Sequence, residues 1–223
     1  MFDMLFGRSA KSTMVTAEQA LPGRPERKYD IPAVHAVLGT PLEGPWPGAE
    51  VLYVGMGCFW GAEKRMWRLD GVVCTAAGYQ GGMTPNPTYD ETCTGRTGHT
   101  EAVLVAYDPT KISTLDVLRC FWENHDPTQV YRQGNDVGTQ YRSAVYWTTD
   151  EQRQVVEATR EAYDAELRGR GFDPISTEIA SAAGRPFYYA EDYHQQYLYK
   201  NPNGYDCHSL TGIALPDVSL PPR

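Results

Sequence analysis

Residues 51–69 read VLYVGMGCFWGAEKRMWRL, and this stretch decides how the chain folds. Its first five residues, Val51–Gly55, form a short apolar run bounded by glycines, which is typical of a buried strand. Residues 60–69 are helix-like and end near Gly71. The sequence therefore predicts a strand and a helix joined by a tight turn, with Cys58 between them.

The chain that follows repeats these two patterns. Apolar, β-rich runs at 72–77, 102–107 and 143–147 predict three further strands, and an S-x-x-D signal at Ser113 predicts the start of a helix before the last of them. The resulting order β-α-β-β-α-β over 51–147 is the split βαβ, ferredoxin-like arrangement. We therefore expect an α+β fold, a two-layer sandwich, to which three later elements are added: a helix over 150–169, a strand over 175–180 and a helix over 190–199.

Both ends of the chain differ from this central region. Residues 1–48 carry prolines at short intervals and no sustained apolar period, so we expect an N-terminal extension without helices or strands. Residues 201–223 are similar and form a predicted C-terminal tail that carries Cys207. The domain itself is expected at 49–200. Its two long loops, 78–100 and 125–141, are better explained by function than by disorder.

The composition excludes several classes of protein. A net charge of −8, from 20 Lys and Arg against 28 Asp and Glu, argues against binding to nucleic acid or to an anionic membrane. No apolar run approaches the roughly 18–20 residues of a membrane span, and residues 1–10 lack the apolar stretch of a secretory signal. Five cysteines without a C-x-x-C pair support neither a disulfide framework nor a zinc site. We expect a cytoplasmic protein, monomeric by default, without metal or organic cofactor.

The turn that carries Cys58 allows more than one interpretation. A dinucleotide-binding fingerprint would need its third glycine one residue before Gly61, where Trp60 stands. A thiol in the first turn of a helix lies close to the helix dipole and backbone N–H groups, which stabilise the thiolate. Cys58 is therefore either a reactive thiol or a small buried hydrophobe.

The two long loops lead to further candidates. Pro85 and Pro87 stiffen the loop before Tyr89. Glu101 opens an apolar strand, and burial there would keep its carboxyl protonated, as a general acid requires. Tyr141 enters a strand after a polar turn. An exposed glutamate and a packing tyrosine are the simpler alternatives for these last two positions.

Together, these segments resemble the signature blocks of the peptide methionine sulfoxide reductase A family. The resemblance covers roughly residues 50–208, in order. It rests on the segments GCFWG at 57–61, TPNPTY at 84–89, GHTE at 98–101, GND at 134–136, GTQYRS at 138–143, AEDYHQQYL at 190–198 and KNPNGY at 200–205.

The resemblance implies a role for the residues in these blocks. The thiolate of Cys58 would attack the sulfur of a methionine sulfoxide, while Glu101 delivers a proton to the sulfoxide oxygen. Tyr89 and Tyr141 would donate hydrogen bonds to that oxygen. Phe59 and Trp60 would receive the substrate methyl group and favour the S epimer. Asp136 is expected to help bind the substrate backbone.

The resemblance also implies how the enzyme is recycled. Release of methionine leaves Cys58 as a sulfenic acid, which condenses with a second thiol. Cys207 falls where the family places its recycling cysteine, although Asp206 is inserted before it and no further cysteine follows. A Cys58–Cys207 disulfide would then be reduced by thioredoxin or a similar dithiol protein. We expect the remaining cysteines, Cys74, Cys93 and Cys120, to be buried packing residues.

Two other classes of function remain open on the residues alone. A compact acidic domain with 15 tyrosines could capture extended peptides, with Cys58 as an inert wall residue. A thiol peroxidase would also form a sulfenic acid, but it would consume hydrogen peroxide without any sulfoxide.

Overall fold

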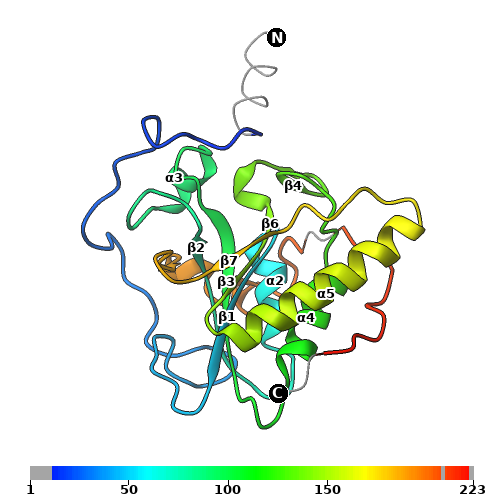
Figure 1. Ribbon diagram of the computed structural model, residues 1–223. Coiled ribbons are helices and arrows are strands. Elements are labelled where there is room, and N and C mark those ends of the chain that lie inside the picture. The colour runs from blue at the N-terminus through cyan, green and yellow to red at the C-terminus, as the bar shows by residue number, and fades with distance from the viewer. Residues whose placement is uncertain (1–11, 207–208, 221–223) are drawn as a thin grey trace.

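A computed structural model describes residues 12–206 and 209–220 of the chain, and its centre is a six-stranded sheet (Figure 1). The strand order is β7-β6-β1-β3-β2-β8. Its four inner strands pair antiparallel throughout; they are β1 (Glu50–Met56), β2 (Val72–Gln80), β3 (Thr100–Tyr107) and β6 (Ser143–Trp147). The order β6-β1-β3-β2 is that of the ferredoxin-like core, which confirms the predicted α+β fold.

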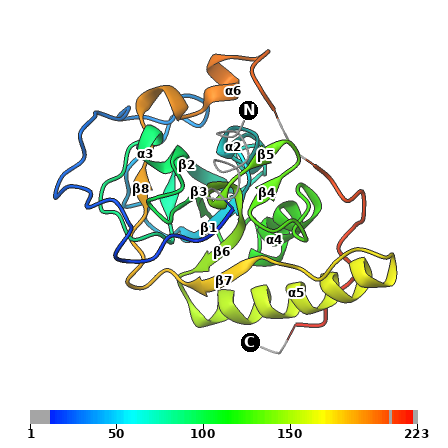
Figure 2. The same cartoon turned by 90° about the horizontal axis from the view of Figure 1, so that it is seen from above.

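Three helices cover one face of this sheet, as the view from above shows (Figure 2). They are α2 (Phe59–Met66), α4 (Thr114–Glu123) and α5 (Asp150–Gly169). Their apolar faces share one buried cluster with Leu52 and Val54 of β1 and with Val103 and Val105 of β3. Helix α4 begins at the predicted Ser113 signal, where Ser113 and Asp116 form a capping box.

The other face of the sheet is covered by the N-terminal extension. Alternate residues of the same strands, including Cys74 and Leu104, point away from the helices and form a second buried cluster. Ile31 and Trp46 of the extension pack against this cluster. Within 12–48 the structure has turns and one isolated bridge between Val34 and Pro41, so the expectation of an extension without helices or strands is confirmed there.

The region after α5 differs most from the prediction. The single helix expected over 190–199 is wrong: the chain forms a short 3-10 helix η2 (Asp192–His194) and a separate helix α6 (Tyr197–Lys200). Gln196 separates them in the left-handed conformation (φ 47°), and its backbone N–H donates to the buried Glu63 carboxylate at 2.8 Å. The strands here are β7 (Glu178–Ser181), which runs parallel to β6, and β8 (Tyr188–Tyr189).

The two long loops contain short elements that were not predicted. They are α3 (Tyr89–Cys93), the strands β4 (Arg132–Gln133) and β5 (Asp136–Val137), and the 3-10 helix η1 (Thr139–Tyr141). Cys93 ends α3 and is only half-buried, so its predicted burial is wrong. Cys74 is buried in β2 and Cys120 in α4 is partly buried against the main core, so both are packing residues, as expected. None of the helices in the described ranges combines the length and the apolar character needed to cross a bilayer.

Candidate active site

Cys58 lies at the junction between β1 and α2, where it is the N-cap residue of the helix. Gly57 makes this junction possible, because it has a positive φ of 86° and a Cβ there would lie 2.5 Å from the Cβ of Gln133. The glycine therefore lets the β4–β5 hairpin approach the start of α2. The Cys58 side chain is largely enclosed, with 7% of the residue exposed.

The sheet brings two of the predicted residues to the same place. Val54 of β1 pairs with Val103 of β3, so Glu101, two residues earlier on β3, lies beside the end of β1. Met56 of β1 pairs with Ser143 of β6, and η1 delivers Tyr141 just before that strand begins. The end of β1 is therefore the meeting point of three strands, next to Cys58.

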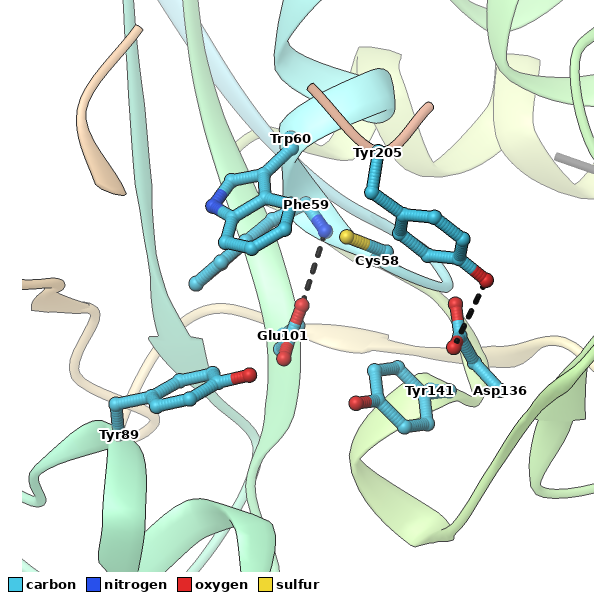
Figure 3. A pocket seen from close by; sticks show the side chains of 8 residues that line it. All are labelled: Cys58, Phe59, Trp60, Tyr89, Glu101, Asp136, Tyr141 and Tyr205. Atoms are coloured by element: carbon cyan, nitrogen blue, oxygen red, sulfur yellow. Dashed lines mark hydrogen bonds between the residues drawn. The ribbon is translucent and has the colours of Figure 1, made fainter. Parts of the chain in front are cut away.

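Seven of the eight predicted site residues line one cavity of about 130 Å³, and Tyr205 completes its lining (Figure 3). The Cys58 sulfur points into this space, and the hydroxyls of Tyr89 and Tyr141 point toward it from the opposite side, next to Glu101. The seven are Cys58, Phe59, Trp60, Tyr89, Glu101, Asp136 and Tyr141. The eighth, Cys207, lies outside the described residues, and its role stays a prediction.

Glu101 has the protonation state that a proton donor needs. It is 2% exposed, and burial raises the pKa of its carboxyl to about 8. The backbone N–H of Phe59 donates to Glu101 Oε2 at 3.0 Å, which opposes this rise, while the negative charge of Asp136 adds to it. Most copies of the protein therefore carry a neutral Glu101 carboxylic acid at pH 7, held against the first turn of α2.

The two tyrosines of the cavity are suited to donating hydrogen bonds. Burial is the main cause that raises the pKa of both Tyr89 and Tyr141 well above the ordinary value, and nearby acidic groups raise it further. Both phenols therefore keep their protons at neutral pH. Two O–H donors and one carboxylic acid face the same space, an arrangement that can stabilise negative charge on a bound oxygen.

An aromatic wall forms the opposite side of the cavity. The ring of Trp60 stacks on Tyr197 at a centroid distance of 3.8 Å, and its indole N–H donates to Nδ1 of His194 at 2.9 Å. His194 is fully buried, and burial lowers its pKa to about 3, so its ring is neutral and Nδ1 can accept this bond. His194 also packs against Phe59 at 4.9 Å. Both wall residues are thus held in fixed orientations.

The C-terminal segment contributes to the lining of the cavity. Tyr205 lines it and donates a hydrogen bond to Asp136 Oδ1 at 3.3 Å. Asp206 forms ion pairs with Lys64 at 2.9 Å and with Arg65 at 3.1 Å, both on α2. These contacts hold the residue directly before Cys207 against the last turn of α2.

Sequence reasoning missed three residues that shape the site: Tyr205, His194 and Glu191. The side chain of Glu191 accepts hydrogen bonds from the backbone N–H of Tyr89 and from the hydroxyl of Tyr79, both at 2.8 Å, and so fixes the start of α3. His194 and Glu191 act on residues more than 100 positions away in the chain, so the sequence did not show what they contact. The available signal was that all three lie in the segments 190–198 and 200–205, which resemble family signature blocks.

The geometry supports thiol chemistry on a polarised oxygen compound. A thiol at a helix start faces an enclosed space in which an oxygen atom would meet an acid and two phenols, while an apolar group would meet Phe59 and Trp60. In the described residues no three His, Cys, Asp or Glu side chains are grouped in a way that could hold a metal ion.

Comparison with known proteins gives one consistent result. The family model for peptide methionine sulfoxide reductase matches residues 50–216. The MsrA enzyme of Rhodospirillum centenum is 56% identical over 210 residues, which cover 94% of this chain and 94% of that protein. The MsrA enzyme of Pseudomonas aeruginosa is 55% identical over 207 residues, which cover 92% of this chain and 95% of that protein.

Solved structures agree with the sequence matches. Methionine sulfoxide reductase A of Corynebacterium diphtheriae superimposes with a TM-score of 0.82 at 49% identity, covering 92% of this chain and all of that one. Mxr1 from Saccharomyces cerevisiae in reduced form gives a TM-score of 0.65 at 32% identity, over 75% of this chain and 95% of its own.

Proposed function

We propose that Cys58 and Glu101 carry the chemistry of this chain. The chain belongs to the peptide methionine sulfoxide reductase family and is an oxidoreductase of the A type, which reduces methionine sulfoxide to methionine. The single observation that carries the proposal is the buried, protonated Glu101 in the same cavity as the thiol at the start of α2. The catalytic domain is assigned to residues 49–200, between an extension at 1–48 and a tail at 201–223.

In the first step the Cys58 thiolate attacks the sulfur of the sulfoxide. Negative charge develops on the sulfoxide oxygen as this bond forms, so protonation of the oxygen is required for the S–O bond to break. Glu101 delivers that proton, and the hydroxyls of Tyr89 and Tyr141 stabilise the oxygen through hydrogen bonds. A positioned acid typically contributes about 10²–10⁴ in rate. The oxygen then passes to the Cys58 sulfur as the bond between the two sulfur atoms breaks, and the electron pair of that bond stays on the substrate sulfur. The products are methionine and a sulfenic acid on Cys58.

In the second step Cys207 attacks the sulfenic sulfur, which forms a Cys58–Cys207 disulfide and releases water. The position of Tyr205 supports this assignment, because this residue lies two positions before Cys207 and lines the same cavity as Cys58. Thioredoxin, or a similar dithiol protein, then reduces the disulfide by thiol–disulfide exchange. Two electrons pass from the dithiol to the sulfoxide in each cycle.

The match to A-type reductases supports a preference for a single sulfoxide epimer, which we propose to be S. A methyl group placed against Phe59 and Trp60 and an oxygen placed toward Glu101 and the two phenols leave one position for the remaining substituent. That substituent, the methionine chain, then points toward Asp136. Free methionine S-sulfoxide and the same residue in proteins are the proposed substrates, so that the enzyme repairs oxidatively damaged proteins.

Composition supports a proposal about the cellular setting. An acidic protein with five cysteines and no disulfide framework suits a reducing compartment, and we assign the protein to the cytoplasm as a monomer.

The test is a stopped assay with the separated S and R epimers, in which methionine and free thiols are measured together. The proposal predicts methionine from the S epimer only, with two thiols lost for each methionine formed. Methionine from both epimers at equal rates would contradict the assigned wall. Thiol loss with hydrogen peroxide but not with either sulfoxide would indicate a peroxidase.

A further inference from the structure

The N-terminal extension lies outside residues 50–216, the part of the chain that carries the family match. In Figure 1 its blue trace runs along the side of the molecule that carries α3. Helix α3 begins with Tyr89, one of the two phenols of the cavity. The contacts between these two segments therefore bear on the position of a proposed catalytic group.

The strongest of these contacts is made by Arg24. Its guanidinium donates two parallel hydrogen bonds to the Glu91 carboxylate, from Nη1 to Oε2 at 2.9 Å and from Nη2 to Oε1 at 2.5 Å. About three quarters of each side chain is shielded from solvent. The Arg24 guanidinium is also the main cause that lowers the pKa of Glu91, so the pair stays charged at neutral pH.

Glu91 is the third residue of α3 and takes part in its N-terminal cap. Its Oε2 accepts the backbone N–H of Thr88 at 2.9 Å, and the Thr88 hydroxyl accepts the N–H of Glu91 in return, which makes a capping box. A helix of five residues is too short to be stable alone. The orientation of α3 therefore depends on this cap and on contacts with the rest of the protein, and Arg24 binds the cap directly.

The extension also fixes the chain on both sides of α3. Before the helix, Arg24 Nη1 donates to the carbonyl of Asn86 at 2.6 Å, and Asn86 Nδ2 donates to the carbonyl of Arg24 at 3.0 Å. After it, the backbone N–H of Leu21 donates to the carbonyl of Arg96 at 3.0 Å. Residues 21–24 thus connect the two ends of the segment that presents Tyr89.

We propose that Arg24 is a positioning residue of the active site, which acts through Glu91 to hold Tyr89 in the orientation that reaches the sulfoxide oxygen. This inference rests on the proposed function, because it assumes that the Tyr89 hydroxyl takes part in the reaction. It gives the extension a part in catalysis in addition to its packing on the sheet. Arg24 itself does not contact the substrate.

The test compares four variants with the wild-type protein in single-turnover formation of methionine, together with hydrogen exchange of the backbone amides at 88–95. Arg24→Ala removes the two parallel hydrogen bonds to the Glu91 carboxylate. Glu91→Gln keeps an oxygen that can accept the Thr88 N–H of the cap but removes the negative charge. Arg27→Ala is the matched control, because Arg27 pairs at 3.2 Å with Glu43, inside the extension. The fourth variant, Tyr89→Phe, removes the hydroxyl and is also combined with Arg24→Ala.

In Arg24→Ala and Glu91→Gln we expect the backbone amide hydrogens at 88–95 to exchange faster than in the wild type. Both variants should form methionine about five- to tenfold more slowly at saturating substrate, with a KM within about twofold of the wild-type value, because a misplaced donor lowers the rate rather than the binding of substrate. Arg27→Ala should match the wild type in both measurements. In the Tyr89→Phe background, Arg24→Ala should cost less than about twofold, since the group that it positions is already absent.

Three results would overturn the proposal. One is unchanged exchange and rate in Arg24→Ala while Tyr89→Phe is slow, which rejects the positioning role and leaves the proposed function intact. Another is an equal cost of Arg24→Ala in the wild-type and Tyr89→Phe backgrounds, which means that Arg24 acts on the whole fold. The third is a wild-type rate in Tyr89→Phe, which rejects the role of Tyr89 itself, whatever the exchange shows.

Discussion

Replacing Glu101 with Gln tests the acid at the centre of the proposed reaction. Glutamine keeps the size of the side chain and an oxygen that can accept the 3.0 Å hydrogen bond from Phe59 N, so the fold should be retained. Only the transferable proton is lost. We expect single-turnover formation of methionine to fall by about 10²–10⁴, the usual contribution of a positioned acid.

The pH dependence gives this prediction a second, independent measure. A pKa of about 8 means that roughly ten Glu101 groups are protonated for each ionised one at pH 7. Above pH 8 the protonated fraction falls about tenfold for each pH unit, and the wild-type rate should show an alkaline decline centred there. In Glu101→Gln that decline should be absent, because the amide does not titrate.

Stability should respond to pH in the same comparison. The folded protein binds the Glu101 proton more tightly than the unfolded chain, in which the carboxyl has its ordinary pKa of 4.5. Stability contributed by the protonated group is therefore complete below about pH 4.5 and is lost as pH rises through 8, at up to about 1.4 kcal/mol per pH unit relative to Glu101→Gln. Urea unfolding at several pH values measures this difference. A Glu101→Gln variant that keeps the wild-type rate, or the same alkaline decline, would refute the assignment of Glu101 as the acid.

Three further substitutions test other parts of the site. Cys207→Ser should form about one methionine per enzyme and then stop in a thioredoxin-coupled assay, since the sulfenic acid is not resolved; sustained turnover would mean that another thiol recycles the enzyme. Tyr141→Phe should slow single turnover by about 10²-fold through loss of one donor, and an unchanged rate would remove Tyr141 from the reaction. His194→Phe leaves the Trp60 N–H without its acceptor and should destabilise the fold by about 1–3 kcal/mol in urea unfolding, a cost that Trp60→Phe should largely remove in the double variant. Equal stability of His194→Phe and the wild type would contradict this.

The sequence predicted those helices and strands whose caps and apolar spacing are set by residues close together in the chain. Helix α5 occupies the predicted 150–169, because Thr149 caps it and its apolar residues keep helical spacing over 20 residues. The ferredoxin-like order followed from the succession of strands and helices alone. The break at Gln196 could not be predicted, since its cause is a hydrogen bond to Glu63, 133 positions earlier.

In the candidate site, too, features set by nearby residues could be predicted and features set by distant residues could not. The place of Cys58 between a strand and a helix left it either a reactive thiol or a small buried hydrophobe, and the resemblance of residues 57–61 to a family signature block made it the predicted nucleophile. The state of Glu101 depends on burial by several elements, and a strand-opening glutamate is compatible with exposure until those elements are placed. Helix α3 was missed because five residues are too few for a helical period to appear, and its stability comes from Arg24 and Glu191, both distant in the chain.

The central claim is that the sulfur of Cys58 itself takes the oxygen from the substrate, and trapping the sulfenic acid tests it most directly. In Cys207→Ser, one equivalent of methionine S-sulfoxide is added in the presence of dimedone, and the labelled residue is identified by peptide mapping. The account predicts one label on Cys58 for each methionine released, and neither label nor methionine when Cys58→Ser is added to the variant. Methionine formed without Cys58, or a label on a different cysteine, would contradict it.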